Sequence, residues 1–450
     1  MPRQFEDENE KLWEAETEPV YEQLDAATKV YWGSQVPGSL AREVLAVAMV
    51  QAVENRGYRV PDGESLITKG LSAIAYDDIV GLHQATHALF EACRTAERDP
   101  DSPYWTYGLY DTFEDYAAAV DFPAAVPVDM GPDLLARIHG GWLAQIVGGA
   151  YGTCLEGYTT DGIRRAYGMP VERYVRRPNT YNDDITYEIA LLMAYEEHGA
   201  ATTSHDIAYQ WMSRIGFGWS AEDMALRNLR CGIMPPQSGR FNNPFYEWIG
   251  AQMRGAVCGQ IWPGNPAKAA EAAFHDAEIS HAYNGILGEV FNALLVSMAF
   301  HETDPRQLVQ DAIALIPADS EYRAVVGFAL EQCRAHDDWL SAWRPCEKRL
   351  ERYNWVHAYP NAAIEVIALW FGEDDFTRTL AICGGCGQDV DCVAAQVMTV
   401  YGTMHGADAI PAYWTDPIGD DLVTTVRGAE RLSIRRLSER TAAVARTLAG

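Results

Sequence analysis

Two adjacent carboxylates stand where a helix is expected to begin. The run Asn182-Asp183-Asp184 directly precedes a segment whose apolar residues recur at helical spacing. Acidic residues are common at helix starts, because the helix dipole and the free backbone N–H groups stabilise them there. Two carboxylates and an amide also form a cluster of hard oxygen donors, which suits Mg²⁺, Mn²⁺ or Ca²⁺ and not zinc. The run therefore predicts either ordinary capping or a metal site.

A second acidic pair, Asp389-Val390-Asp391-Cys392, also stands directly before an expected helix. An Asp-x-Asp pair can direct both carboxylates at one ion, although capping explains the pair equally well. Neither motif is specific by itself. Two such clusters at helix starts of one helical domain favour a shared metal site, because facing helices commonly build carboxylate metal sites.

A third candidate is Glu156, which lies in a loop after a glycine-containing helix that includes Gly148 and Gly152. A lone Glu in a loop is usually solvated, so its role depends on where the loop lies.

Cysteines and histidines have a structural explanation. Cys383 and Cys386 have the two-residue spacing of zinc and redox sites, but no second ligand pair follows at finger-like spacing. We expect them to be small buried residues. His281 and His357 lie on expected core helices or at their starts, where a structural histidine is commoner than a catalytic one.

The elements that would position these residues are almost all helices. Amphipathic periodicity covers 39–57 and 77–99, and the longer apolar segments are 134–152, 183–199, 277–300, 359–372 and 392–406. Glycines four apart, at Gly148 and Gly152 and at Gly402 and Gly406, predict close approach of helix backbones. The sequence therefore predicts an all-α fold.

Residues 97–116 are rich in aromatic residues, Pro, Gly and Asp, which indicates a connector. We place a boundary near residue 125, with a helical N-terminal extension over 1–125 and the main domain over 126–450. The extension carries no motif from which a function can be inferred.

Bulk properties narrow the function classes. A formal net charge of -28 disfavours binding to nucleic acid or to an anionic membrane. The nine cysteines are scattered, which fits reduced thiols better than a disulfide framework. The charged start lacks the apolar core of a secretory signal, so we expect a cytoplasmic protein.

The order of the three acidic motifs resembles that of the ADP-ribosylglycohydrolase family, in a divergent bacterial branch of the dinitrogenase reductase-activating glycohydrolase type. The resemblance runs from about Leu134 to Trp414 and includes the spacers between the motifs, such as NPFYEWIGAQMRGAVCGQIWPGN and VHAYPNAAIEVIALWFGEDDF. It implies a compact orthogonal helical bundle with a dinuclear Mg²⁺ or Mn²⁺ centre, and an enzyme that hydrolyses glycosidic bonds.

The resemblance also assigns residues. The implied metal ligands are Asn182, Asp183, Asp184, Asp389, Asp391 and Cys392. The implied catalytic carboxylates are Glu156, Asp183 and Asp184, and one of them would activate a water molecule. The implied substrate-binding residues are Gly250, Arg254, Ser280 and His281, where the first two belong to a diphosphate-binding helix start that lacks the usual Asn-Gly-Ser.

Several positions depart from the family pattern. Gly149 replaces an Asp, Asn182 and Ile185 replace hydroxyl residues, and Cys392 stands where an oxygen ligand is usual. A cysteine sulfur is a poor ligand for Mg²⁺, so one metal position is expected to be weak, empty or filled by a softer ion.

The expected function is therefore metal-dependent hydrolysis of a ribosyl N- or O-glycosidic bond in an ADP-ribosylated protein or an ADP-ribosyl small molecule. A hydrolase of a nucleoside or NAD-derived metabolite is one alternative. A non-catalytic ADP-ribose-binding protein is the other.

Overall fold

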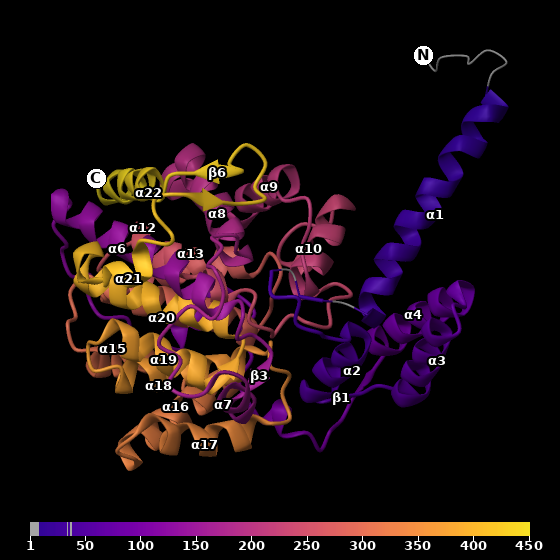
Figure 1. The fold of residues 1–450 in the computed structure, drawn as a ribbon, viewed down its shortest axis with the longest axis horizontal. Helices are drawn as coiled ribbons and strands as arrows, with labels where there is room; N and C mark the ends of the chain where they lie inside the picture. Colours follow the sequence, from indigo (N-terminus) through magenta and orange to yellow (C-terminus); the bar gives the residue numbers. More distant parts are fainter. Residues whose placement is uncertain (1–8, 34, 37) are drawn as a thin grey trace. The chain divides into compact units, whose positions relative to one another are not determined.

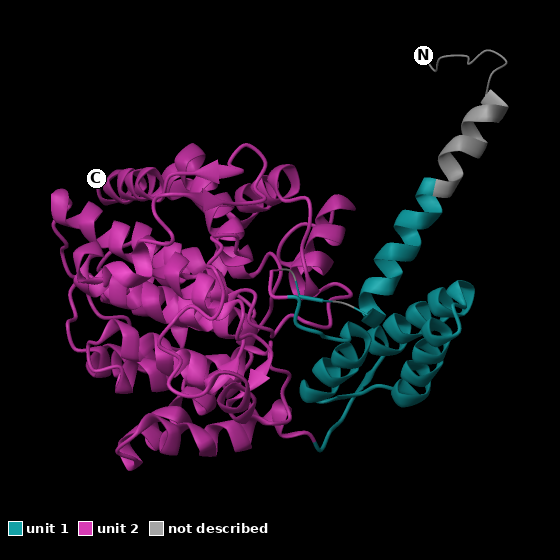
Figure 2. Cartoon of the chain, in the orientation of Figure 1, with its two compact units in different colours: residues 1–36, 40–101 teal, residues 37–39, 102–450 magenta. Residues whose placement is uncertain are grey.

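The structure of the chain is a computed structural model. It describes residues 9–33, 35–36 and 38–450, with side chains from residue 19 onward. The contacts within the chain group it into two units (Figure 2). One comprises residues 1–36 and 40–101, and the other comprises 37–39 and 102–450.

The smaller unit is helical, as predicted for the N-terminal extension. Its elements are α1 (Asn9–Gly33), α2 (Leu45–Asn55), β1 (Tyr58–Arg59), α3 (Gly63–Ala75), α4 (Ile79–Arg94) and β2 (Glu97–Arg98), and the two strands pair antiparallel. Asp78 caps helix α4, because its carboxylate accepts a hydrogen bond from the Gly81 N–H at 2.9 Å. Trp32 of α1 donates to the Thr86 hydroxyl of α4 at 2.7 Å, which ties these two helices together.

The larger unit begins with the connector. Its first elements are the 3-10 helix η1 (Pro103–Thr106), α5 (Phe113–Ala118), α6 (Pro132–Gly152), β3 (Tyr158–Thr159), α7 (Thr160–Tyr167), α8 (Asp183–His198), η2 (Gly199–Ala201), α9 (Ser204–Arg214), α10 (Ser220–Arg230), α11 (Gln237–Arg240), η3 (Gln252–Arg254), α12 (Ala256–Ile261) and α13 (Pro266–Ala277). It continues with α14 (Asn284–Met298), α15 (Pro305–Ala314), α16 (Glu321–Ala335), α17 (Trp339–Leu350), α18 (Ala358–Phe371), α19 (Phe376–Cys386), β4 (Gly387–Gln388), α20 (Val390–His405), η4 (Ala407–Ala409), α21 (Ala412–Thr415), β5 (Leu422–Val423), β6 (Arg431–Leu432) and α22 (Ile434–Ala449). The predicted all-α fold class is confirmed, since the strands of the described chain have only two residues each (Figure 1).

The core of the larger unit consists of helices that are apolar on nearly every side. Every residue of α14 is buried, and α18 and α20 are buried over most of their length. Such helices must lie inside the protein, because no face of them is polar enough for water. They form the framework on which the acidic motifs stand.

Helices α6 and α20 pack closely along their length, as the glycine spacing predicted. A Cβ atom built at Gly148 would lie closer than 3.0 Å to the Ala394 carbonyl, and one at Gly402 would meet the Gly140 backbone equally closely. Gly406 is the C-cap of α20 and has a φ of 76°. Its backbone lies against Gly140 of α6. Only glycine permits these approaches.

One expected helix is divided. The apolar segment 277–300 contains the end of α13 and the whole of α14, separated by residues 278–283. Tyr283 has a φ of 50°, which a continuous helix does not allow, and the preceding Ser280 and His281 make buried hydrogen bonds instead.

The expected domain boundary near residue 125 stays a prediction. The contacts divide the chain earlier, after Asp101. Tyr116 of the connector is fully buried and donates to the Leu315 carbonyl at 2.9 Å, so the connector packs with the larger unit. No helix among the described residues is long and apolar enough to cross a bilayer.

Candidate active site

The first acidic motif stands at the start of α8, where Asn182 is the cap. Its backbone is extended, with a φ of -153°, and its Oδ1 accepts a hydrogen bond from the Asp184 N–H at 2.7 Å. The amide of Asn182 is therefore the capping group of α8, and the Asp183 carboxylate also accepts backbone hydrogen bonds at this helix start. Asp184 is fully buried and Asp183 is partly exposed, which makes Asp183 the more accessible of the two.

The second motif stands at the start of α20. Asp389 occupies the cap position, but its side chain makes no capping hydrogen bond. Its backbone N–H donates to Asn361 Oδ1 of α18 at 3.2 Å, which fixes the turn. Asp391 Oδ1 accepts from the Cys392 N–H at 2.9 Å. The Cys392 thiol donates to Asp184 Oδ1 at 3.3 Å, so the starts of α8 and α20 meet.

The third motif joins them through a short hairpin. The Gly157 N–H donates to the Gln388 carbonyl at 2.9 Å, and β3 pairs with β4 directly before Asp389. Glu156 is therefore held beside the second motif and is only 6% exposed, so of the two alternatives it is not a solvated loop residue. The Ser39 side chain, which the contacts group with the larger unit, hydrogen-bonds to Glu156.

Burial and mutual repulsion dominate the electrostatics of this cluster. Burial raises the pKa of Asp183 to about 7, and the neighbouring Asp391 adds to the rise. Burial, together with the other carboxylates, holds the pKa values of Glu156, Asp184 and Asp389 well above their usual range. Like charges in a dry site oppose each other's ionisation, and a cation at the same place would relieve that repulsion.

The donor set fits a divalent cation. Glu156 Oε2, Asp184 Oδ2 and Asp389 Oδ1 are buried and have no hydrogen-bond partner among the residues that the structure describes. Buried carboxylate oxygens without a partner are costly unless a ligand uses them. One ligand atom each from Asp389, Asp391 and Cys392 lies within 4.8 Å of the others. The carboxylates suit Mg²⁺ or Mn²⁺, whereas the sulfur suits a softer ion.

The predicted substrate-binding arginine lies in a buried ion network. Arg254 is 1% exposed and pairs with Asp276, with Glu222 at 3.1 Å and with Glu289 at 3.6 Å. A Cβ at Gly250 would lie closer than 3.0 Å to the Glu222 carboxylate. Arg254 therefore holds the start of the 250–254 turn to α10, α13 and α14, and its contact with substrate stays a prediction.

Ser280 and His281 belong to the same network. The Arg254 guanidinium donates to Ser280 Oγ at 3.0 Å, and the Ser280 hydroxyl and His281 Nδ1 lie 2.7 Å apart. His281 Nε2 accepts from the Ala251 N–H at 3.2 Å. Both side chains are fully buried, so they support the 250–254 turn from inside the protein.

The other candidates have structural partners. His357 caps α18, because its Nδ1 accepts from the Tyr359 N–H at 3.2 Å. Cys383 and Cys386 are buried in α19, as small core residues are expected to be.

Three residues near the motifs were missed by the sequence reasoning. Ser39 and Asn361 contact Glu156 and Asp389, and Glu222 contributes to the raised pKa of Asp183. None of them stands in an acidic motif. Asn361 and Glu222 are buried, which a single sequence does not reveal, and the half-buried Ser39 lies far along the chain from Glu156.

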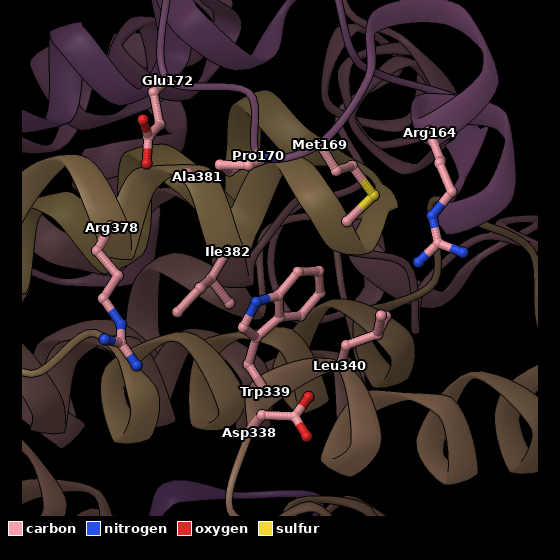
Figure 3. A pocket seen from close by; sticks show the side chains of 10 residues that line it. All are labelled: Arg164, Met169, Pro170, Glu172, Asp338, Trp339, Leu340, Arg378, Ala381 and Ile382. Carbon is pink, nitrogen blue, oxygen red and sulfur yellow. The ribbon is translucent and has the colours of Figure 1, made fainter.

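A surface cavity of about 580 Å³ lies elsewhere on the larger unit (Figure 3). The Trp339 indole lies between the guanidinium groups of Arg164 and Arg378 in this view, and Ala381 and Ile382 of α19 form part of the cavity wall. None of the predicted site residues lines it. The site is therefore assigned from the carboxylate geometry.

Comparison with known proteins agrees with this arrangement. Fold and site define an all-helical protein whose buried carboxylates converge from three helix ends. The family model for ADP-ribosylglycohydrolase matches residues 130–447, so the chain belongs to the ADP-ribosylglycohydrolase family. These proteins hydrolyse glycosidic bonds, and the predicted enzyme class is thus confirmed.

A solved structure supports the fold. A chain described as an ADP-ribosylglycohydrolase-related protein complex superposes with a TM-score of 0.52 at 20% sequence identity, covering 70% of this chain and 99% of that chain. No curated protein matches the chain. The predicted compact helical bundle of the ADP-ribosylglycohydrolase type is confirmed.

Proposed function

We propose that the chain is a metal-dependent hydrolase of the ribosyl N- or O-glycosidic bond in an ADP-ribosylated protein or an ADP-ribosyl small molecule. The observation that carries the proposal is the convergence of buried carboxylates with unpaired oxygens at the meeting point of α6, α8 and α20. Membership of the family supplies the ADP-ribosyl group as the expected substrate.

The carboxylates have distinct surroundings that suit distinct roles. Asp184, Asp389 and Asp391 are nearly inaccessible and would hold Mg²⁺, Mn²⁺ or another divalent ion. Asn182 is a weaker candidate ligand, because its amide oxygen already accepts from the Asp184 N–H. When bound, the ion would supply positive charge that fixes and polarises the ribose hydroxyls.

Cleavage at the anomeric carbon passes through an oxocarbenium-like transition state, and it requires a base for the attacking water. Glu156 and Asp183 border the ligand carboxylates, and Asp183 is the more exposed. We assign Asp183 as the first candidate base and Glu156 as the second. In either case the carboxylate accepts a proton from the water while the water oxygen bonds to the anomeric carbon. The glycosidic bond breaks, its electron pair stays on the leaving nitrogen or oxygen, and that atom takes up a proton.

Substrates can be distinguished by a direct assay. The full-length protein, supplied with Mn²⁺ or Mg²⁺, is incubated with peptides ADP-ribosylated on Arg or Ser, with ADP-ribosyl small molecules, and with nucleosides and NAD. Release of ADP-ribose from either modified peptide or from the ADP-ribosyl small molecules supports the proposal. Cleavage restricted to nucleosides or NAD replaces it with the metabolite hydrolase, and ADP-ribose binding without turnover of any donor replaces it with a binding protein.

A further inference from the structure

We infer that Cys392 is a thiolate ligand of the divalent ion, and that it makes this site prefer thiophilic cations such as Zn²⁺, Co²⁺ and Cd²⁺ over Mg²⁺. The inference rests on the metal site of the proposed function and adds the selectivity of that site.

The thiol points into the carboxylate cluster. Cys392 is 5% exposed, and its Sγ lies 3.3 Å from Asp184 Oδ1. Its Sγ and one oxygen each from Asp389 and Asp391 lie within 4.8 Å of one another. Asp389, Asp391 and Cys392 thus each offer one ligand atom close to the other two. Asp184, at the start of the other helix, lies beside them.

The hydrogen bonding of the cluster remains incomplete. A thiol has one hydrogen to donate, and Asp184 Oδ1 receives it. Asp184 Oδ2 and Asp389 Oδ1 then have no donor among the described residues, although Asp184 is 0% and Asp389 3% exposed. Both oxygens are buried acceptors on carboxylates that lie close to the sulfur, and a cation bound in this cluster would satisfy them and the sulfur at once.

The backbone holds the sulfur in place. The Cys392 N–H donates to Asp391 Oδ1 at 2.9 Å within the first turn of α20, and Gly152 of α6 packs directly against that turn. Met253 Sδ lies 3.8 Å from Cys392 Sγ. The sulfur therefore has a polarizable neighbour on one side and carboxylate oxygens on the other.

Coordination requires only the loss of the thiol proton. The divalent ion bonds to the sulfur, the S–H bond breaks, and the proton leaves to the solvent buffer, with no change of oxidation state. Zinc and cobalt accept mixed sulfur and oxygen ligands, whereas Mg²⁺ demands oxygen. A thiolate in the ligand set therefore shifts the preference of the whole site.

Cobalt reports sulfur ligation without reference to activity. The full-length protein is freed of metal and titrated with Co²⁺ while the near-ultraviolet thiolate-to-cobalt charge-transfer band is recorded. Cys392→Ser is the test variant. Cys258→Ser is the matched control, because Cys258 is another buried thiol near a carboxylate, with its Sγ 3.9 Å from Glu289 Oε1.

We expect the charge-transfer band in the wild type and in C258S, and we expect C392S to lack it. The ratio of Zn²⁺ affinity to Mg²⁺ affinity should fall about tenfold or more in C392S relative to the wild type. If C392S does not fold, X-ray absorption at the zinc edge of the zinc-loaded wild type tests the sulfur ligand instead. The spectrum must then contain a Zn–S distance of about 2.3 Å.

The contrary outcomes separate the two proposals. Stoichiometric Co²⁺ binding without a charge-transfer band, or a zinc shell of oxygen and nitrogen alone, overturns thiolate ligation and leaves the metal-dependent hydrolase standing. If the protein binds none of Co²⁺, Zn²⁺, Mn²⁺ and Mg²⁺, the metal site is overturned, and both proposals fail with it.

Discussion

Gly152, the last residue of α6, packs against Asp391 in the first turn of α20. A Cβ atom at Gly152 would lie closer than 3.0 Å to the Asp391 Cα and backbone nitrogen, where real Cβ atoms are essentially never found. The contact joins the helix that leads into the Glu156 loop to the helix that carries Asp391 and Cys392. The position of the acidic cluster thus depends on a residue without a side chain.

Gly152→Ala should therefore separate the two helices. The obstructing atoms are backbone and cannot rotate away, so we expect a loss of about 1–3 kcal/mol in the free energy of unfolding, measured with urea, together with weaker metal binding. Gly327→Ala is the control, because nothing lies within 4 Å of a Cβ at Gly327 of α16. That variant should gain about 0.5–1 kcal/mol from helix propensity. Equal stability of the two variants would contradict the close contact.

Asp184→Asn and Asp391→Asn should abolish turnover while leaving the helical content intact. Each removes one negative charge from the proposed ligand set with little change of shape. We expect rates to fall roughly 100-fold or more, since a metal ion contributes several kcal/mol to transition-state stabilisation, and metal content after gel filtration to fall with them. Circular dichroism checks the fold, and wild-type rates in both variants would exclude the proposed site.

Much of this arrangement could be predicted from the sequence, because the core helices are apolar over many residues and the acidic motifs stand at their starts. The prediction of one helix over 277–300 was wrong, because the helical spacing of apolar residues continues through Tyr283, whose φ of 50° interrupts the helix. Arg254 could not be located, because an arginine in a buried ion network has the same local sequence as one that contacts a ligand. Ser39 was missed because its partner Glu156 lies far along the chain.

Replacing Glu365 should change the pH dependence of stability. Glu365 is fully buried in α18, where its Oε1 accepts from Gln252 Nε2 at 2.8 Å, and burial raises its pKa to about 8. In the folded protein the carboxyl group stays protonated up to that pH, whereas in the unfolded chain it ionises from about pH 4.5. Its contribution to stability is therefore full below about pH 4.5 and is lost as the pH rises to about 8.

Glu365→Gln keeps the acceptor oxygen and cannot ionise. Its stability relative to the wild type should rise by about 1.4 kcal/mol per pH unit between roughly pH 5 and 8, as urea unfolding at several pH values would show. If the stability difference between E365Q and the wild type did not vary with pH, the pKa of Glu365 would have to be the same in the folded and the unfolded protein, which would contradict the prediction.

Removing Arg254 from its buried ion network should strongly destabilise the protein. Arg254→Met leaves the carboxylates of Glu222, Asp276 and Glu289 buried without their cation, so we expect a loss of about 3–5 kcal/mol in the free energy of unfolding. Arg431→Met breaks an exposed pair with Asp421 and should leave the free energy of unfolding nearly unchanged, because solvent screens such a pair. Similar losses in the two variants would contradict the buried network.

The most direct test of metal-dependent hydrolysis is the rate of ADP-ribose release from an ADP-ribosylated peptide before and after prolonged dialysis against EDTA, with the metal content measured on the same samples. The carboxylate cluster predicts that activity is lost together with the metal and returns when a divalent ion is restored. Undiminished ADP-ribose release from protein shown to contain no metal would contradict it.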